Sequence, residues 1–112
     1  MDAYRPVWAE IDLEAVRANV RALRALVSPA AVCAVVKADA YGHGAVPVAR
    51  AAIDGGAAAL AVALVEEGVQ LRDAGITAPI VVLSEPVPAA AESVVGPHLA
   101  TQIGRASCRE RV

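Results

Sequence analysis

Phenylalanine is absent from the sequence, and one tryptophan and two tyrosines are its only aromatic residues. Hydrophobic residues nevertheless make up 57% of the 112 residues, which excludes a disordered chain. The apolar fraction therefore consists of small side chains, mainly alanine and valine. Because alanine favours helices and valine favours strands, this balance predicts an α/β protein.

Neither sign of charge is in clear excess, and no long hydrophobic run occurs. The net charge is −2 and the pI about 5.6, so neither nucleic acid nor an anionic membrane surface is an expected partner. The longest apolar run, residues 57–65, is far shorter than the roughly 20 residues of a membrane-spanning helix. The amino-terminal segment lacks the basic and apolar stretches of an export signal, so we expect a cytoplasmic location.

Cysteine and lysine are also scarce. The two cysteines, Cys33 and Cys108, do not have the spacing of metal ligands, and we expect no metal site. Cys33 lies in an apolar run, which favours a small buried side chain. Lys37 is the only lysine, whereas the other cationic residues are all arginine.

Hydrophobic periodicity divides the chain into alternating strands and helices. Residues 7–11 form a short predicted strand, and Asp12 then caps a helix that ends at Ser28-Pro29. Apolar runs predict strands over 31–36, buried on both faces, and over 59–63 and 80–83, with a further strand beginning at 98–101. Helices are predicted over 45–54, from Glu66 to just before Gly75, and over 87–95. The predicted buried face of the first helix is Leu13, Val16, Val20, Leu23 and Val27.

This alternation predicts right-handed βαβ units and a parallel sheet. About three βα units are present, whereas a closed (β/α)8 barrel takes roughly 250 residues. The first loop also lacks the G-x-G-x-x-G pattern of dinucleotide-binding folds. The chain is therefore either a minimal open sheet or part of a barrel.

Lys37 directly follows the valine-rich strand over 31–36, at the predicted carboxyl end of that strand. A lysine amine can form a Schiff base with a carbonyl cofactor, which the guanidinium of arginine cannot. The carboxyl ends of parallel strands are also where barrel active sites lie. The alternative interpretation is a lysine that extends from the strand end into water.

The turn after Lys37 reads Ala38-Asp39-Ala40-Tyr41-Gly42-His43-Gly44. Its glycines permit a close backbone approach, and it leads into a helix amino terminus, which favours phosphate. The Tyr41 hydroxyl adds a donor, so this segment suits a phosphorylated aldehyde. An ordinary βα turn is the alternative. We expect His43 to face solvent or cap the helix, because no second metal ligand lies nearby.

The run from Ala34 to Gly44, AVVKADAYGHG, resembles the pyridoxal-phosphate signature of alanine racemases. The signature is specific, because related barrels keep the lysine but not the residues that follow it here. The similarity covers about residues 5–101. Further matching segments are WAEIDL at 8–13 with Asn19, VALVEEG at 62–68, LRDAGI at 71–76 and APIVVL at 78–83.

The resemblance implies an (α/β)8 barrel followed by a β-rich domain, a head-to-tail homodimer and pyridoxal 5′-phosphate as cofactor. It implies that Lys37 binds the cofactor covalently and exchanges the substrate Cα proton on one face. Tyr41 would bind the phosphate, and Leu83 would pack near the cofactor ring. The implied reaction interconverts L- and D-alanine, which supplies D-alanine for peptidoglycan. Two other classes stay open: a non-catalytic pyridoxal-phosphate-binding barrel, and a small α/β interaction domain without a cofactor.

Part of the family pattern is missing. The acid/base on the opposite substrate face is a tyrosine from the partner subunit in this family, and neither Tyr4 nor Tyr41 matches its motif. Residues 1–102 are therefore predicted to be a racemase fragment that is inactive by itself. Residues 103–112 lack helix or strand periodicity and match a translated DNA sequencing adapter, so we expect a non-native tail. A genuine basic tail is the alternative.

Overall fold

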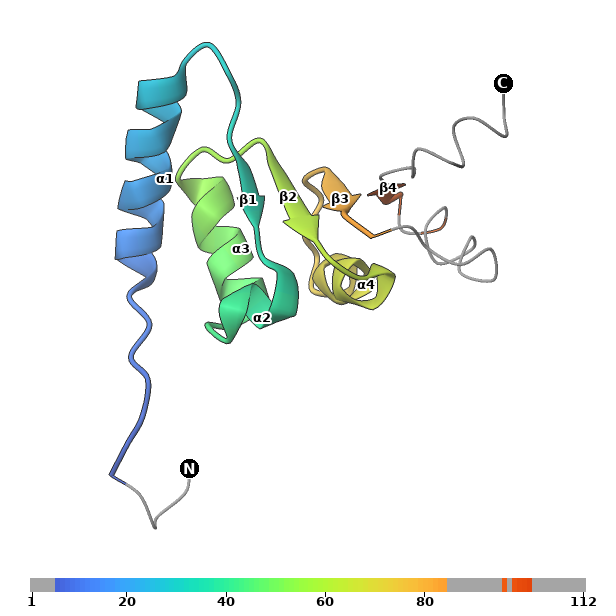
Figure 1. Ribbon diagram of the computed structural model, residues 1–112, viewed down its shortest axis with the longest axis horizontal. Coiled ribbons are helices and arrows are strands. Elements are labelled where there is room, and N and C mark those ends of the chain that lie inside the picture. Colours follow the sequence, from blue (N-terminus) through green and yellow to red (C-terminus); the bar gives the residue numbers. More distant parts are fainter. Residues whose placement is uncertain (1–5, 85–95, 97, 102–112) are drawn as a thin grey trace.

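A computed structural model describes residues 6–84, 96 and 98–101 of the chain. Strands β1 to β4 form one parallel sheet in chain order, and helices α3 and α4 connect successive strands (Figure 1). This arrangement confirms the predicted parallel βα units. No helix within the described ranges is long and apolar enough to cross a membrane. The elements are α1 (Leu13–Val27), β1 (Cys33–Val35), α2 (Lys37–Tyr41), α3 (Ala45–Asp54), β2 (Ala59–Val62), α4 (Val65–Asp73), β3 (Ile80–Val82) and β4 (Ala100–Thr101).

Helix α1 forms where the sequence predicts it. The Asp12 carboxylate accepts a hydrogen bond from the backbone N–H of Ala15 at 3.1 Å, which caps the first turn. The predicted buried face is only partly buried, because Val20 is buried whereas Leu23 is 50% exposed. Helix α1 lies beside α3 (Figure 1), and Val20 belongs to a small cluster with Ala52 of α3, against which Ala34 of β1 also packs.

The predicted strand over residues 7–11 is wrong. This segment pairs with none of the described strands, and the side chains of Val7 and Trp8 are exposed. The Trp8 indole N–H donates instead to the carboxylate of Glu10 at 3.1 Å. A strand needs a neighbour for its backbone groups, and the described part of the chain offers none here.

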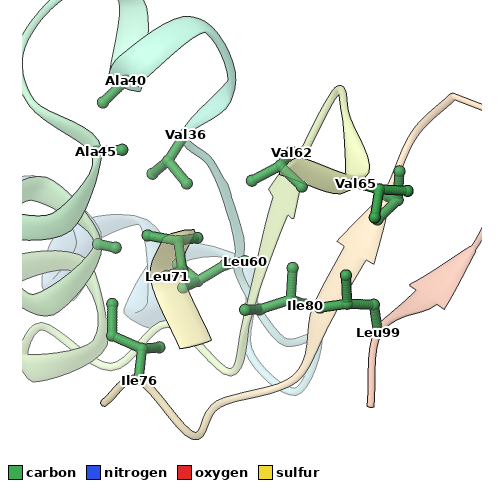
Figure 2. Packing of buried hydrophobic residues seen from close by; sticks show 12 residues of the cluster. Val36, Ala40, Ala45, Leu60, Val62, Val65, Leu71, Ile76, Ile80 and Leu99 are labelled. Atoms are coloured by element: carbon green, nitrogen blue, oxygen red, sulfur yellow. The ribbon is translucent and has the colours of Figure 1, made fainter. Parts of the chain in front are cut away.

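The main core lies between the sheet and the helices α3 and α4 (Figure 2). Alternate residues of a strand share one face, so Leu60 and Val62 of β2 enter the core together, as do Ile80 and Val82 of β3. All four are buried completely or almost so. The other buried members of this cluster are Val36, Ala40, Ala45, Ala49, Val65, Leu71, Ile76 and Leu99.

No helix in the described ranges covers the opposite face of the sheet. Cys33 and Val35 of β1 are exposed there, so the predicted burial of this strand on both faces, and of Cys33, is wrong. The reason is that β1 is an edge strand, and only Ala34 and Val36 contact the core beneath it. Helices on one face only are typical of a barrel segment, whereas a doubly wound sheet has helices on both faces. The predicted helix over 87–95 lies outside the described residues.

Candidate active site

Lys37 lies at the carboxyl edge of the sheet, as the sequence predicts. It follows Val36, whose backbone N–H donates to the Ala61 carbonyl at 2.8 Å and extends the β1–β2 ladder. The Lys37 side chain is half-buried and has neither a hydrogen bond nor an ion pair with any described residue. Its amine is therefore available for a ligand. No cluster of metal-ligating side chains occurs in the described part of the chain.

Leu83 lies at the same edge, after β3. Its backbone N–H donates to the Val62 carbonyl at 2.8 Å, and its side chain is 40% exposed. Because strand residues alternate, Leu83 shares the helix-free face with Val81. The neighbouring Ser84 hydroxyl donates to the Ala63 carbonyl, which connects the segments that follow β2 and β3. The carboxyl ends of three strands are thus joined into one edge.

The segment from Lys37 to Tyr41 forms a short helical turn, α2, where the sequence predicted a loop. Ala38, Asp39, Ala40 and Tyr41 have φ values between 52° and 58°, which is the left-handed region. A left-handed residue other than glycine costs roughly 1–2 kcal/mol, so contacts from outside the turn must stabilise it. Gly42 then adopts a φ of 86°, and its N–H donates to the Ala38 carbonyl at 3.0 Å.

Two carboxylates connect the turn to its surroundings, one from within the turn and one from α4. Asp39 Oδ1 accepts from the backbone N–H of Ala45 at 2.7 Å, which connects the turn to the start of α3. Glu67 of α4 accepts from the backbone N–H of Ala38 through Oε2 at 2.6 Å. The sequence placed Glu67 only within the helix predicted to begin at Glu66. No local pattern reveals its contact with the turn after β1, because 29 positions separate the two residues.

Phosphate binding at the start of α3, which the sequence suggested, is not supported by this geometry. The Asp39 carboxylate occupies the N–H of Ala45 and brings a negative charge to that helix end. His43 is exposed, and its Nδ1 donates to the Ala40 carbonyl at 2.9 Å. Tyr41, 61% exposed, retains a hydroxyl that can reach outward from the turn. No hydrogen bond joins Tyr41 to Lys37 in the described structure.

Helices on one face of a parallel sheet, together with an available lysine amine at its carboxyl edge, define part of a βα barrel with its site at the strand ends. The family model described as "Alanine racemase, N-terminal domain" matches residues 11–107. This chain belongs to that family. Its fold class, a partial (β/α)8 barrel, is confirmed by the structural relatives described next.

Two curated relatives are alanine racemases from Symbiobacterium thermophilum and Desulfovibrio desulfuricans. The first is 59% identical over 95 residues, covering 85% of this chain and 25% of the relative. The second is 50% identical over 100 residues, covering 88% and 27%. A crystal structure of alanine racemase from Bacillus anthracis with bound L-Ala-P matches with a TM-score of 0.84 at 41% identity, covering 92% of this chain and 27% of that one. The chain thus spans about a quarter of the length of the relatives it matches.

Proposed function

We propose that this chain is the amino-terminal, cofactor-binding part of a pyridoxal-phosphate-dependent alanine racemase. The observation that carries the proposal is the Lys37 amine, which is half-buried at the carboxyl edge of β1 without a partner among the described residues. A small interaction domain gives no reason for a single lysine at this place. Family membership over residues 11–107 adds independent support for the same reaction.

The residues present fit this cofactor. When bound, pyridoxal phosphate supplies an electrophilic aldehyde and a ring that accepts electrons from the substrate Cα. Lys37 would hold the cofactor covalently and carry a proton at Nζ to and from one face of the substrate. The Tyr41 hydroxyl would donate to the phosphate, and the half-exposed Leu83 side chain would pack near the ring.

The remaining parts of the proposal concern the whole protein. We infer a small amino-acid substrate, a homodimer and a cytoplasmic location, with D-alanine supplied to peptidoglycan. The acid/base for the opposite substrate face lies outside this chain, so residues 1–102 are proposed to be inactive alone. Residues 103–112 are proposed to be a translated adapter rather than native sequence; the family match, which ends at residue 107, includes the first five of them. The native gene, read past codon 102, should instead continue with further barrel strands and a β-rich domain.

Covalent labelling tests the proposal in the full-length protein that contains this segment. Borohydride reduction of the cofactor-loaded protein, followed by peptide mapping, should place the reduced cofactor on the peptide with Lys37. Lys37→Arg should abolish this label and nearly all alanine racemisation, because a guanidinium cannot attack the aldehyde as an amine does.

The control is Arg21→Lys, which adds a lysine on the exposed side of α1. The added lysine should stay unlabelled and racemisation should persist. Label on a different lysine of the wild-type protein would contradict the role of Lys37. Label on Lys37 without racemisation of any amino acid would instead favour the non-catalytic cofactor-binding barrel.

A further inference from the structure

We propose that Glu67 is a positioning residue for Lys37, which it holds in place through the backbone of the turn that follows β1. This inference rests on the proposed function, because it assumes that the Lys37 amine must reach the cofactor aldehyde. Glu67 is half-buried in the first turn of α4, next to the carboxyl edge of the sheet. It has no role in the chemistry proposed above.

The Glu67 carboxylate contacts two strand ends at once. Oε2 accepts from the N–H of Ala38 at 2.6 Å, in the segment that follows β1. Oε1 accepts from the N–H groups of Ala63 and Leu64 at 2.9 and 2.8 Å, in the segment that follows β2. One side chain therefore fixes the distance between the two segments. Hydrogen bonds to a charged acceptor are the stronger kind, and the Ala38 contact is the shortest of the three.

The contact with Ala38 acts directly on Lys37. The N–H of Ala38 belongs to the peptide group whose carbonyl comes from Lys37, so this hydrogen bond orients the peptide plane next to the lysine Cα. The four left-handed residues after it are unfavourable for their side chains and would relax if released. A reacting group displaced by about 1 Å can lose a hundredfold in rate.

Capping of α4 alone does not account for this geometry. A glutamate at the third helical position normally reaches back to the N–H before the helix, which here is the Leu64 contact through Oε1. The contact of Oε2 with Ala38 contributes nothing to that cap. It joins α4 to the lysine-bearing turn, and it is this contact that the test must remove selectively.

Glu67→Gln separates the two contacts in the full-length enzyme. The amide has one acceptor oxygen, which can keep the Ala63 and Leu64 contacts, while its NH2 group would face the N–H of Ala38 and repel it. Glu66→Gln is the matched control. Glu66 is the neighbouring carboxylate, exposed and without a hydrogen bond or ion pair in the described structure.

Two readouts besides activity test the role. The rate at which pyridoxal phosphate becomes attached to Lys37 in the apo-protein should fall roughly 10- to 100-fold in Glu67→Gln, in line with the loss of a charge-assisted hydrogen bond. Hydrogen exchange should accelerate at the amide of Ala38 and stay slow at Leu64. The melting temperature of the Glu67→Gln apo-protein should stay close to that of the Glu66→Gln apo-protein. The Glu66→Gln control should attach the cofactor at the wild-type rate.

Three outcomes would overturn the inference. The first is attachment at the wild-type rate in Glu67→Gln. The second is rapid hydrogen exchange at Ala38 in the unaltered apo-protein, a measurement that does not depend on whether the variant folds. The third is hydrogen exchange in Glu67→Gln that accelerates equally at Ala38 and throughout α4. That result would show that Glu67 serves only to cap α4. If the wild-type protein itself attaches no cofactor at Lys37, the proposed function fails instead.

Discussion

Tyr41 illustrates how a single residue can be placed by the backbone rather than by its own contacts. It is the last residue of the left-handed turn, and its side chain is largely exposed. Lys37, at the other end of the same turn, is also without a partner in the described structure. The carboxylates of Asp39 and Glu67, by contrast, accept hydrogen bonds from backbone N–H groups, Asp39 through one oxygen and Glu67 through both. The turn thus carries the available side chains of Lys37 and Tyr41, and the carboxylates of Asp39 and of Glu67 in α4 hold its backbone.

Tyr41→Phe should weaken cofactor retention before it slows chemistry. The substitution removes one hydroxyl that would donate to a charged phosphate, a loss of roughly 1.5–3 kcal/mol, or about 10- to 150-fold in Kd. Because the side chain is 61% exposed, folding should be unaffected. Titration of the full-length apo-protein with pyridoxal phosphate measures the Kd, and the melting temperature of the apo-protein serves as the control. An unchanged Kd would remove Tyr41 from the phosphate site.

At the scale of elements, the packing of α1 on α3 depends on a glycine. Gly55 follows α3 with an ordinary φ of −75°, so a side chain there would meet no backbone strain. A Cβ at this position would lie 2.7 Å from the Arg17 carbonyl oxygen and 3.0 Å from the Cβ of Val20. The backbone of α1 therefore approaches the end of α3 too closely for any other residue. The buried part of this contact consists of Val20, Ala52 and Ala57.

Gly55→Ala should lower the melting temperature of the full-length protein. The added methyl group displaces the backbone of α1, which we expect to cost roughly 1–3 kcal/mol. Gly68→Ala is the comparison, because the tight contacts of its Cβ would be with the two terminal carbons of the Leu99 side chain, at 2.9 and 3.1 Å. Ile80 Cγ2 would lie at 3.6 Å, an ordinary van der Waals distance. That side chain can move, and alanine gains about 0.5–1 kcal/mol over glycine within a helix. Equal melting temperatures for the two variants would show that α1 does not pack on α3 this closely.

At the scale of the molecule, the described helices cover only one face of the sheet. Helices cover the side that carries Leu60 and Ile80, while Val35 and Leu83 are exposed on the other side. In a closed barrel the strands opposite would fill this inner face. Strand β1 is also an edge strand of the sheet formed by the described residues, and an open edge favours association between chains.

Purified residues 1–102 should therefore aggregate or fold only partly, and should be inactive. No described strand covers the apolar inner face or the open edge, and the second acid/base of the proposed reaction is expected outside this chain. Thermal unfolding followed by circular dichroism tests whether the fragment folds cooperatively. Sedimentation determines its mass and shows whether it aggregates. An alanine racemisation assay tests whether the fragment is inactive, with the full-length enzyme as the positive control. A cooperative transition from a monomer, or measurable racemisation, would contradict this view.

The sequence by itself determined most of the element order and the candidate residue. Asp12, the apolar runs and Gly75 define local events, namely a cap, buried strands and a helix end, and such signals act over a few residues. Lys37 was conspicuous as the only lysine and was followed by a family-specific run. Local rules and one specific motif were therefore enough for the parallel βα order and for the chemistry proposed.

Only the tertiary structure decided what surrounds these elements. Burial depends on neighbours, so Cys33 in an apolar run is exposed on an edge strand, and residues 7–11 form no strand without a partner. The left-handed turn after Lys37 could not be predicted, because alanine and tyrosine avoid that conformation unless distant contacts favour it. Glu67 provides such a contact across 29 positions. Contacts of that length depend on how strands align in the sheet, which the periodicity of a sequence does not specify.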